Sequence, residues 1–198
     1  MNRRLTRLLP AFAGRGDRSV RLRGRMSTQD HPAAPLCVAT VTVSDTRTPE
    51  DDAGGPELRR LLEGAGFRLG VHRIIPDGVD SVRETVRALC ADPGTDAIVT
   101  TGGTGISPRD QTYEAIDGLL ERRLDGFGEA FRRLSWEEVG PRAILSRALA
   151  GTVAGKIVVA LPGSPRALAL AVDKILAPVL PHAAAVAAGR SSHHKKGA

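Results

Sequence analysis

The sequence predicts an α/β fold in which helices pack around an open, mostly parallel β-sheet. Four short, mainly apolar runs rich in β-branched residues are continuous rather than alternating, a pattern typical of strands buried on both faces. These runs are Leu36–Val43, Leu69–Ile75, Asp96–Thr101 and Lys156–Leu161. Helical periodicity fills the intervals between them, and such alternation favours right-handed crossovers within one sheet. The 198 residues are enough for one domain with a sizeable core.

Two helices are predicted in the first half of the chain. The first carries apolar residues at the i, i+3, i+4, i+7 spacing, namely Leu58, Leu61, Leu62 and Ala65. Gly66 stands where this helix should stop. The second helix has one apolar face, made of Val79, Val82, Val86, Leu89 and Cys90. Ser81 and Glu84 have the spacing of a capping box near its start.

Four further helical segments are predicted in the second half. They run over about 113–123, through an irregular region containing Phe131 and Trp136, over 144–149, and onward from Ser164 and Pro165. Ser164 and Pro165 are suited to be the N-cap and the first residue of the last helix, which we expect to end at Pro178 and Pro181. We interpret Phe131 and Trp136 as core or subunit-contact residues rather than as part of a cofactor site.

Composition narrows the class of protein. With 41% hydrophobic and 25% charged residues, the chain has a globular composition. No stretch approaches the roughly 20 apolar residues that span a bilayer, so no integral membrane function is expected. Cys37 and Cys90 both lie in apolar runs, which predicts buried free thiols and a cytoplasmic protein.

The formal net charge of +6 comes from the two ends of the chain, because residues 1–25 hold eight arginines and one acid. We expect residues 1–31 to be a flexible Arg-rich extension, 32–189 the folded domain and 190–198 a disordered tail. The extension has no apolar segment long enough for a signal peptide. Its only aromatic residue is Phe12, so nucleic-acid binding is a minor alternative.

Three predicted strands end in turns of small, polar or glycine residues. They are Ser44-Asp45-Thr46, Thr101-Gly102-Gly103-Thr104-Gly105 and Pro162-Gly163-Ser164-Pro165. Because the carboxyl ends of parallel strands share one edge of a sheet, we expect these turns to converge. Glycines allow close approach of the backbone to an anion, and helix N-termini attract phosphate. The alternative for the second turn is a tight strand-to-helix connection that requires positive φ.

Two acids lie close to these turns. Asp77 follows the second strand and Asp110 follows the glycine-rich turn. Two carboxylates at a phosphate-binding edge suit Mg²⁺, which completes its shell with phosphate oxygens and water. The alternatives are an ordinary Pro-Asp-Gly turn for Asp77 and a helix cap for Asp110. The isolated His72 favours a hydrogen-bonded structural histidine over a metal ligand.

Five motifs occur in the order seen in the MogA/MoaB family of molybdenum-cofactor biosynthesis, which includes the G domain of gephyrin. They are Val43-Ser44-Asp45-Thr46, Ile75-Pro76-Asp77, Thr100-Thr101-Gly102-Gly103-Thr104-Gly105 with Arg109-Asp110, Leu145-Ser146-Arg147 and Leu161-Pro162-Gly163-Ser164-Pro165. The chain resembles this family over about residues 36–188. Five motifs in register are far more specific than any one of them.

The resemblance implies a three-layer α/β/α molybdopterin-binding fold that forms a homotrimer or a hexamer. It implies that molybdopterin and ATP react, with Mg²⁺ as cofactor, to give adenylated molybdopterin and pyrophosphate. Asp77 and Asp110 match the family's two essential acids, which would act in catalysis by placing Mg²⁺. Asp52 matches a further recurrent acid, with a helix-cap role as the alternative. The implied substrate-binding residues are Ser44, Asp45, Thr101, Gly102, Gly103, Thr104, Gly105, Ser146, Arg147, Pro162, Gly163 and Ser164.

Departures from the family pattern leave two functions to be weighed. One is a molybdopterin adenylyltransferase, and the other is a MoaB-type protein that binds and carries the pterin without catalysis. The segment 135–141 is one residue longer than in MogA-type sequences and looks like the MoaB branch, some members of which are inactive. The retained Arg109 and Asp110 favour activity, whereas Tyr113, at a position where proline is usual, affects only the local turn.

Overall fold

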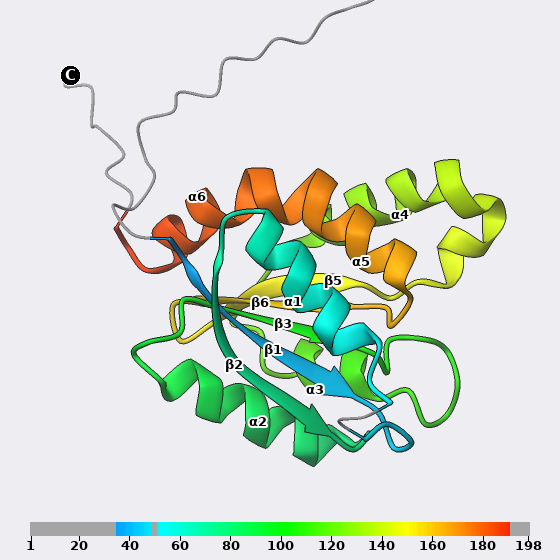
Figure 1. Ribbon diagram of the computed structural model, residues 1–198, viewed down its shortest axis with the longest axis horizontal. Helices are drawn as coiled ribbons and strands as arrows, with labels where there is room; N and C mark the ends of the chain where they lie inside the picture. The colour runs from blue at the N-terminus through cyan, green and yellow to red at the C-terminus, as the bar shows by residue number, and fades with distance from the viewer. Residues whose placement is uncertain (1–34, 49–50, 191–198) are drawn as a thin grey trace, which may run out of the picture.

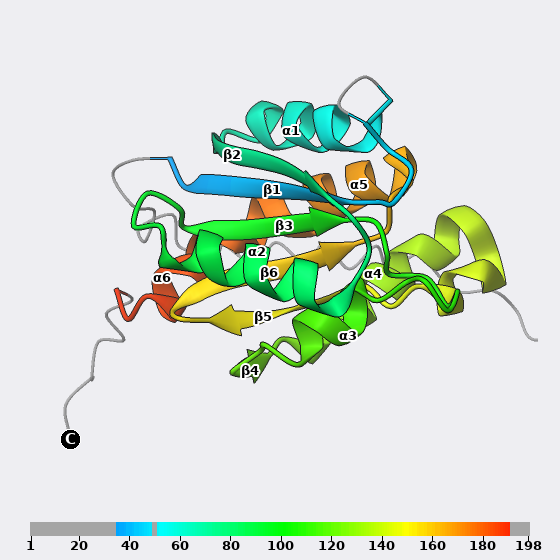
Figure 2. The same cartoon turned by 90° about the horizontal axis from the view of Figure 1, so that it is seen from below.

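Six strands form one sheet in the computed structural model, which describes residues 35–48 and 51–190. The strands are β1 (Cys37–Val43), β2 (Arg68–Ile75), β3 (Ala97–Thr101), β4 (Arg122–Arg123), β5 (Leu149–Val153) and β6 (Lys156–Leu161). Their order across the sheet is β2-β1-β3-β6-β5-β4 (Figure 2). The first four in this order are parallel, and β5 and β4 continue the sheet antiparallel. From β1 the chain moves outward to β2 and then returns to the other side of β1, so the order reverses between β1 and β3.

Helices cover both faces of the sheet, which confirms the predicted three-layer α/β/α architecture (Figure 1). They are α1 (Gly54–Gly64), α2 (Val79–Ala91), α3 (Thr112–Asp117), α4 (Asp125–Val139), α5 (Pro165–Ala171) and α6 (Ala177–Ala187). A 3₁₀ helix, η1 (Gly140–Leu145), follows α4, and a π-helical turn, η2 (Val172–Leu176), joins α5 to α6. Helices α1, α4, α5 and α6 lie on one face, and α2 and α3 lie on the other.

The apolar strands explain the two cores. All residues of β1 and β3 are buried, and their side chains alternate between the two faces of the sheet. Val38 and Val99 pack toward α1 and α5, whereas Val41 and Ile98 pack toward α2. Because both faces are covered, these strands contain continuous apolar runs instead of an alternating pattern.

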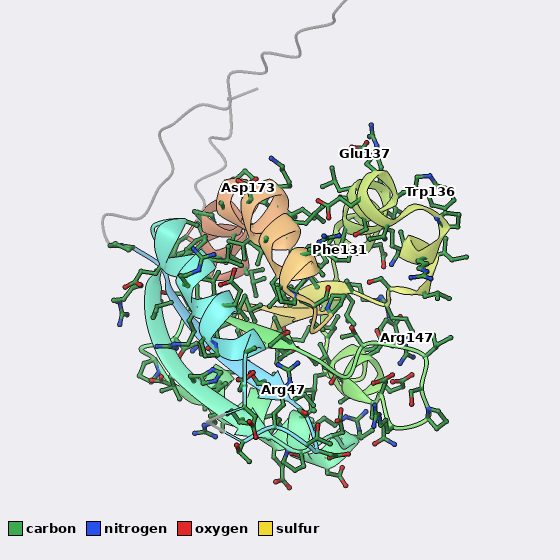
Figure 3. All side chains as sticks on the ribbon, turned by 45° about the vertical axis from the view of Figure 1, so that its right-hand side comes forward. Arg47, Phe131, Trp136, Glu137, Arg147 and Asp173 are labelled. Atoms are coloured by element: carbon green, nitrogen blue, oxygen red, sulfur yellow. The ribbon has the colours of Figure 1, made fainter. Side chains whose placement is uncertain are left out.

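Phe131 and Trp136 of α4 were predicted to be core or subunit-contact residues, and only Phe131 is a core residue. Phe131 is buried in the core and stacks against Phe127, with 6.4 Å between the ring centroids. Trp136 lies at the outer end of α4, away from the sheet, and is 51% exposed (Figure 3). Trp136 is therefore not a core residue of this chain, and the predicted subunit contact remains the alternative for it.

The second half of the sheet departs from the prediction. All four predicted strands form, but β2 lies at the edge of the sheet and, contrary to the prediction, is not buried on both faces. The helix predicted over 144–149 is wrong, because η1 ends at Leu145 and β5 begins at Leu149. Strand β5 forms an antiparallel hairpin with β6 through Ala154 and Gly155, both at positive φ. The helix predicted over 113–123 ends at Asp117, and the chain then forms the short edge strand β4.

The helix ends show which of the predicted capping residues act as caps. Gly66 has φ +88° directly after α1, as predicted, and Ser164 accepts a hydrogen bond from the Ala167 N–H at the start of α5. The predicted capping box is wrong, since α2 begins at Val79 and its N-cap position, Gly78, makes no side-chain cap. Ser81 therefore lies inside the first turn of α2.

The prediction that the last helix ends at Pro178 and Pro181 is wrong, because the helix continues to Ala187. The π-helical turn η2 shifts the hydrogen-bond register just ahead of Pro178, which falls in the first turn of α6, where proline is tolerated. The continuous helix Pro165–Ala187 has 23 residues and an 18-residue window of mean hydropathy 1.4. By length and composition alone it would qualify as a membrane span, contrary to the prediction, but Leu168 and Leu176 on it are buried in the core.

The ends of the chain are described only in part. The predicted Arg-rich extension over 1–31 lies outside the described residues, as do residues 191–198 of the predicted tail. Arg190, the first residue of that tail, is described and donates a hydrogen bond to Oδ1 of Asp96 at 3.4 Å. Cys37 and Cys90 are buried free thiols, as predicted, and burial raises the pKa of both.

Candidate functional site

A cavity of about 560 Å³ opens at the edge of the sheet where β1, β3 and β6 end. The three turns that the sequence singles out all contribute to it, at the reversal of strand order between β1 and β3. The end of η1, the residues after β2 and the loop that carries Arg109 and Asp110 supply the remaining walls. The lining residues are Thr42, Val43, Ser44, Asp45, Thr46, Arg47, Asp77, Thr101, Gly102, Gly103, Thr104, Gly105, Arg109, Asp110, Leu145, Ser146, Pro162, Gly163 and Ser164.

Hydrogen bonds continue beyond the strand ends and hold the turns against one another. The Gly102 N–H donates to the Leu161 carbonyl at 3.1 Å, and the Thr101 hydroxyl donates to the Pro162 carbonyl at 3.3 Å. The Ser44 N–H donates to the carbonyl of Ile75 at 2.9 Å. The floor of the cavity is thus an extension of the sheet.

Two glycines of the central turn are required by the geometry of the chain. Gly102 has φ +99°, and a Cβ there would lie 2.3 Å from the Val43 carbonyl oxygen. Gly103 has φ +62°, and its Cβ would lie 2.2 Å from the Thr112 hydroxyl. The tight turn considered from the sequence is therefore present, and it also brings bare backbone to the cavity wall.

Asp77 lies next to this backbone without a compensating partner. Its Oδ1 is buried, makes no hydrogen bond among the described residues, and lies 2.7 Å from the point where a Cβ of Gly103 would be. Burial raises the pKa of Asp77, and the nearby charges of Asp45 and Asp110 raise it further. The Asp77 N–H donates to Oδ1 of Asp45 at 2.9 Å, which fixes the end of β2 to the first turn.

Asp110 approaches the same backbone from the other side. Its Oδ2 accepts a hydrogen bond from the Ser107 N–H at 2.9 Å and lies 2.7 Å from the point where a Cβ of Gly105 would be. Helix α3 begins two residues later with Gln111 at the N-cap position, so Asp110 does not cap it. Both carboxylates therefore lie beside the glycine turn and line one cavity.

The donor set fits a divalent cation that shares its ligands with a phosphate. Within residues 35–48 and 51–190 there is no cluster of three or more His, Cys, Asp and Glu side chains able to hold a metal ion. An all-protein metal cage is therefore not formed by this part of the chain. Mg²⁺ usually takes one or two carboxylates and completes its shell with phosphate and water, and the unpartnered Oδ1 of Asp77 suits that use.

Asp52 anchors the wall of the cavity instead of lining it. Its Oδ1 accepts hydrogen bonds from the N–H groups of Gly54 and Gly55 at 3.0 Å, as a helix cap does. Its Oδ2 accepts from the Thr42 hydroxyl at 2.7 Å. Burial favours a raised pKa for Asp52, but these bonds outweigh it and hold the pKa below its ordinary value.

Arg47, which sequence reasoning missed, forms an ion pair with Asp52 at 3.1 Å and lines the cavity (Figure 3). The sequence feature that could have indicated this residue is its position directly after the turn Ser44-Asp45-Thr46. His72 is a hydrogen-bonded structural residue, as predicted, with its Nδ1 2.9 Å from the Thr40 hydroxyl.

One residue of the predicted site does not line the cavity. Arg147 is not among the residues that line it, and its Cζ lies 4.9 Å from the centroid of the Tyr113 ring. It donates to the carbonyl oxygen of Asp110 at 3.0 Å. The other predicted substrate-binding residues all line the cavity, together with the unpredicted Thr42, Val43, Thr46 and Leu145.

Comparisons with known proteins find similar proteins that cover most of this chain. Residues 39–182 match the family model described as a probable molybdopterin binding domain. Molybdenum cofactor biosynthesis protein B of Bacillus subtilis is 45% identical over 161 residues, which cover 79% of this chain and 95% of that protein.

Two solved structures extend the comparison. A crystal structure of molybdenum cofactor biosynthesis protein B has a TM-score of 0.76 at 39% identity, covering 79% of this chain and 98% of that one. The tungsten cofactor synthesizing protein MoaB of Pyrococcus furiosus has a TM-score of 0.67 at 32% identity, covering 79% and 99%.

Proposed function

This chain belongs to the MogA/MoaB family of molybdenum-cofactor biosynthesis proteins, and we propose that it acts there as a molybdopterin adenylyltransferase. In this reaction an oxygen of the molybdopterin phosphate forms a bond to the α-phosphorus of ATP. The bond between the α-phosphorus and its bridging oxygen breaks, and pyrophosphate leaves. The observation that carries the proposal is the pair of carboxylates, Asp77 and Asp110, beside one glycine-rich turn in one cavity.

Bringing two phosphate-bearing substrates together requires that their repulsion be offset. The bare backbone at Gly102 and Gly103 allows phosphate oxygens to approach main-chain N–H groups closely. Arg47 and Arg109 add two cationic side chains to the same cavity. Such fixed donors favour the in-line arrangement and stabilise the charge that develops in the transition state.

The two carboxylates would hold Mg²⁺ with the substrate phosphates. When bound, the ion would supply charge neutralisation at the phosphate oxygens. Asp77 is suited to this role because its buried Oδ1 has no hydrogen-bond partner within the described ranges. Ser107 orients the carboxylate of Asp110 by donating its N–H to Oδ2. A cavity of about 560 Å³ also falls within the range of 300–1,000 Å³ usual for small-molecule sites.

Pyrophosphate release from ATP is the direct test. The purified chain is incubated with ATP, Mg²⁺ and molybdopterin, and pyrophosphate and adenylated pterin are measured together. We expect the two products in equal amounts, and none when molybdopterin or Mg²⁺ is omitted. Intact molybdopterin binding without turnover would reject the transferase and support the alternative, a carrier that binds the pterin.

Asp110→Asn is the sharpest variant for this assay. It removes the charge at the cavity while an amide oxygen can still accept from the Ser107 N–H. We expect turnover to fall by about 100-fold or more, with pterin binding and the fold largely retained. Asp80→Asn, at an exposed acid in the first turn of α2, is the matched control and should keep the wild-type rate. A near-normal rate for Asp110→Asn would remove this residue from the mechanism.

A further inference from the structure

Arg147 contacts both ends of the loop that carries Asp110. Its Nε donates to the carbonyl of Thr104 at 3.4 Å, and its Nη2 donates to the carbonyl of Asp110 at 3.0 Å. Residues 104–110 between these two points contribute Gly105, Arg109 and Asp110 to the cavity wall. A single guanidinium thus links the beginning and the end of this loop.

The same guanidinium is held in turn by helix α3. Both of its terminal nitrogens hydrogen-bond the Glu114 carboxylate, and its plane lies 4.9 Å from the centroid of the Tyr113 ring. The hydrogen bond from Arg147 lowers the pKa of Glu114. The loop closes on α3 as well, because the Thr112 N–H donates to the Gly103 carbonyl at 2.9 Å.

Beyond Thr104, which is buried, little else fixes the loop. Ile106, its one large apolar side chain, is 68% exposed, and residues 106–109 are all exposed. The bonds inside the loop join Ser107 and Asp110 to each other, through Ser107 N–H to Oδ2 and Asp110 N–H to the Ser107 carbonyl. These bonds shape the loop locally but do not attach it to the body of the domain. Attachment depends on polar contacts, of which Arg147 supplies two.

We propose that Arg147 is a positioning residue that clamps the loop 104–110 onto α3 and thereby sets the place of Asp110 in the cavity. Arg147 does not act as a substrate ligand in this arrangement, since its guanidinium is bound to Asp110 and Glu114 and does not line the cavity. The effect on catalysis rests on the proposed adenylyl transfer, whereas the attachment of the loop by Arg147 is independent of that function.

The clamp depends on the shape of arginine and not only on its charge. A planar guanidinium can stack on Tyr113 while donating in three directions, to Thr104, Asp110 and Glu114. A lysine ammonium at this position would keep the positive charge but would not make these bonds together. Arg147→Lys therefore distinguishes a clamp from a residue that merely attracts anionic substrates.

Amide hydrogen exchange on the substrate-free chain tests the clamp directly. In Arg147→Gln and in Arg147→Lys we expect the amide of Thr112, whose hydrogen bond to the Gly103 carbonyl closes the loop on α3, to exchange at least about tenfold faster than in the wild type. Arg123→Gln is the matched control. Arg123 donates to the Tyr113 hydroxyl at 3.0 Å, and its other side-chain hydrogen bonds within the described residues go to Asp117 and Asp125, not to the loop.

Thermal unfolding of each variant confirms that the protein is folded before its exchange is compared. Unchanged exchange in Arg147→Gln, or wild-type exchange in Arg147→Lys, would overturn the clamp. Faster exchange in Arg123→Gln equal to that in Arg147→Gln would also overturn it, because the effect would then belong to Tyr113.

Kinetics separate positioning from substrate binding. If Arg147 acts through Asp110, both Arg147 variants lower kcat while KM for ATP and molybdopterin changes by less than about twofold. A raised KM with unchanged loop exchange would make Arg147 a substrate ligand and overturn the proposal. If the wild type itself shows no turnover, the proposed function fails, and the exchange experiment still decides the clamp.

Discussion

At the scale of single residues, the surroundings of Asp77 disfavour its charged form and raise its pKa. Its buried Oδ1 has no hydrogen-bond partner in the described part of the chain, and Asp45 and Asp110 add like charge nearby. Groups with a raised pKa in a cleft are often functional, because only a ligand or a proton can relieve them. We therefore expect Asp77 to lower the stability of the ligand-free protein at neutral pH.

Asp77→Asn should unfold at a higher temperature than the wild type at pH 7. The pKa of Asp77 is raised in the folded state, so between the unfolded and folded pKa values the folded state binds more protons. Stability is therefore lost as the pH rises through that window, and the asparagine variant avoids this loss. Thermal melts at pH 7 and at pH values below the ordinary pKa should show an advantage that shrinks in acid. An advantage that is absent or grows in acid would contradict this prediction.

The pKa of Asp52 is shifted in the opposite direction to that of Asp77, because every one of its hydrogen bonds favours the charged form. Asp52→Asn should lower the free energy of unfolding at pH 7 by about 2–4 kcal/mol, measured by urea denaturation. The folded pKa is depressed, so this contribution is present above the unfolded pKa and is lost as the pH falls through the folded value.

The neighbouring Asp51→Asn is the control for this prediction. Asp51 is exposed, and among the described residues its carboxylate accepts a hydrogen bond from the Thr48 hydroxyl alone, at 3.2 Å. We expect Asp51→Asn to change the free energy of unfolding by less than about 0.5 kcal/mol. An equal loss of unfolding free energy in the two variants would contradict the prediction that the hydrogen bonds of Asp52 stabilise the fold.

At the scale of elements, the sequence signals were strongest where both faces of a strand are buried. Strands β1, β3 and β6 could be predicted because their apolar runs are continuous, and α5 because Ser164 and Pro165 mark its start. The sequence prediction missed the start of β5 because the residues of η1, just before it, indicated a helix that would continue to Leu149. The signal was the pair Ala154 and Gly155, whose turn requires positive φ at both positions.

The candidate site was predictable to the extent that strand ends determine it. The turns after β1, β3 and β6 converge because parallel strands end at one edge. The place of Arg147 could not be predicted, because it depends on the packing of α3 against the loop 104–110. No periodicity in the sequence indicates which way a long, flexible side chain turns.

Gly102 provides a test at this scale. Gly102→Ala combines a φ of +99° with a Cβ 2.3 Å from the Val43 carbonyl oxygen, so β1 and β3 must separate or the turn must move. Gly66→Ala has a similar φ of +88°, but a Cβ there meets nothing within 4 Å. We expect Gly66→Ala to cost about 1–2 kcal/mol of unfolding free energy and Gly102→Ala clearly more. Similar costs in denaturant melts would show that the turn adapts without strain.

At the scale of the whole molecule, apolar side chains are exposed at one end of the domain. Trp136 and Val139 on α4 and Ile144 and Leu145 on η1 are 44–67% exposed, and Leu145 also lines the cavity. Exposed apolar groups of this kind mark interaction surfaces. The homotrimer implied by the family resemblance is therefore our expectation for the assembly, with Trp136 in a subunit contact.

Trp136→Ser tests this expectation. The wild type should have a native mass of three times the 20.9 kDa of one chain, and the variant should shift toward the single-chain mass in light scattering. Since Trp136 is the only tryptophan in the sequence, its fluorescence reports on this one site. Val179→Ser, at a 48% exposed position on α6, is the control and should leave the mass unchanged. A single-chain mass in the wild type at all concentrations would contradict the trimer.

The two described ends of the chain meet at the edge of the sheet opposite the cavity. Asp96, at the start of β3, accepts hydrogen bonds both from the Cys37 N–H at 2.9 Å and from Arg190 at 3.4 Å. The cavity lies where the same strands end. An affinity handle, a fluorescent reporter or a second enzyme joined directly to Pro35 or to Arg190 would therefore be attached remote from the mouth. The fold is in this respect suited to tethering on a solid support with its cavity facing the solution.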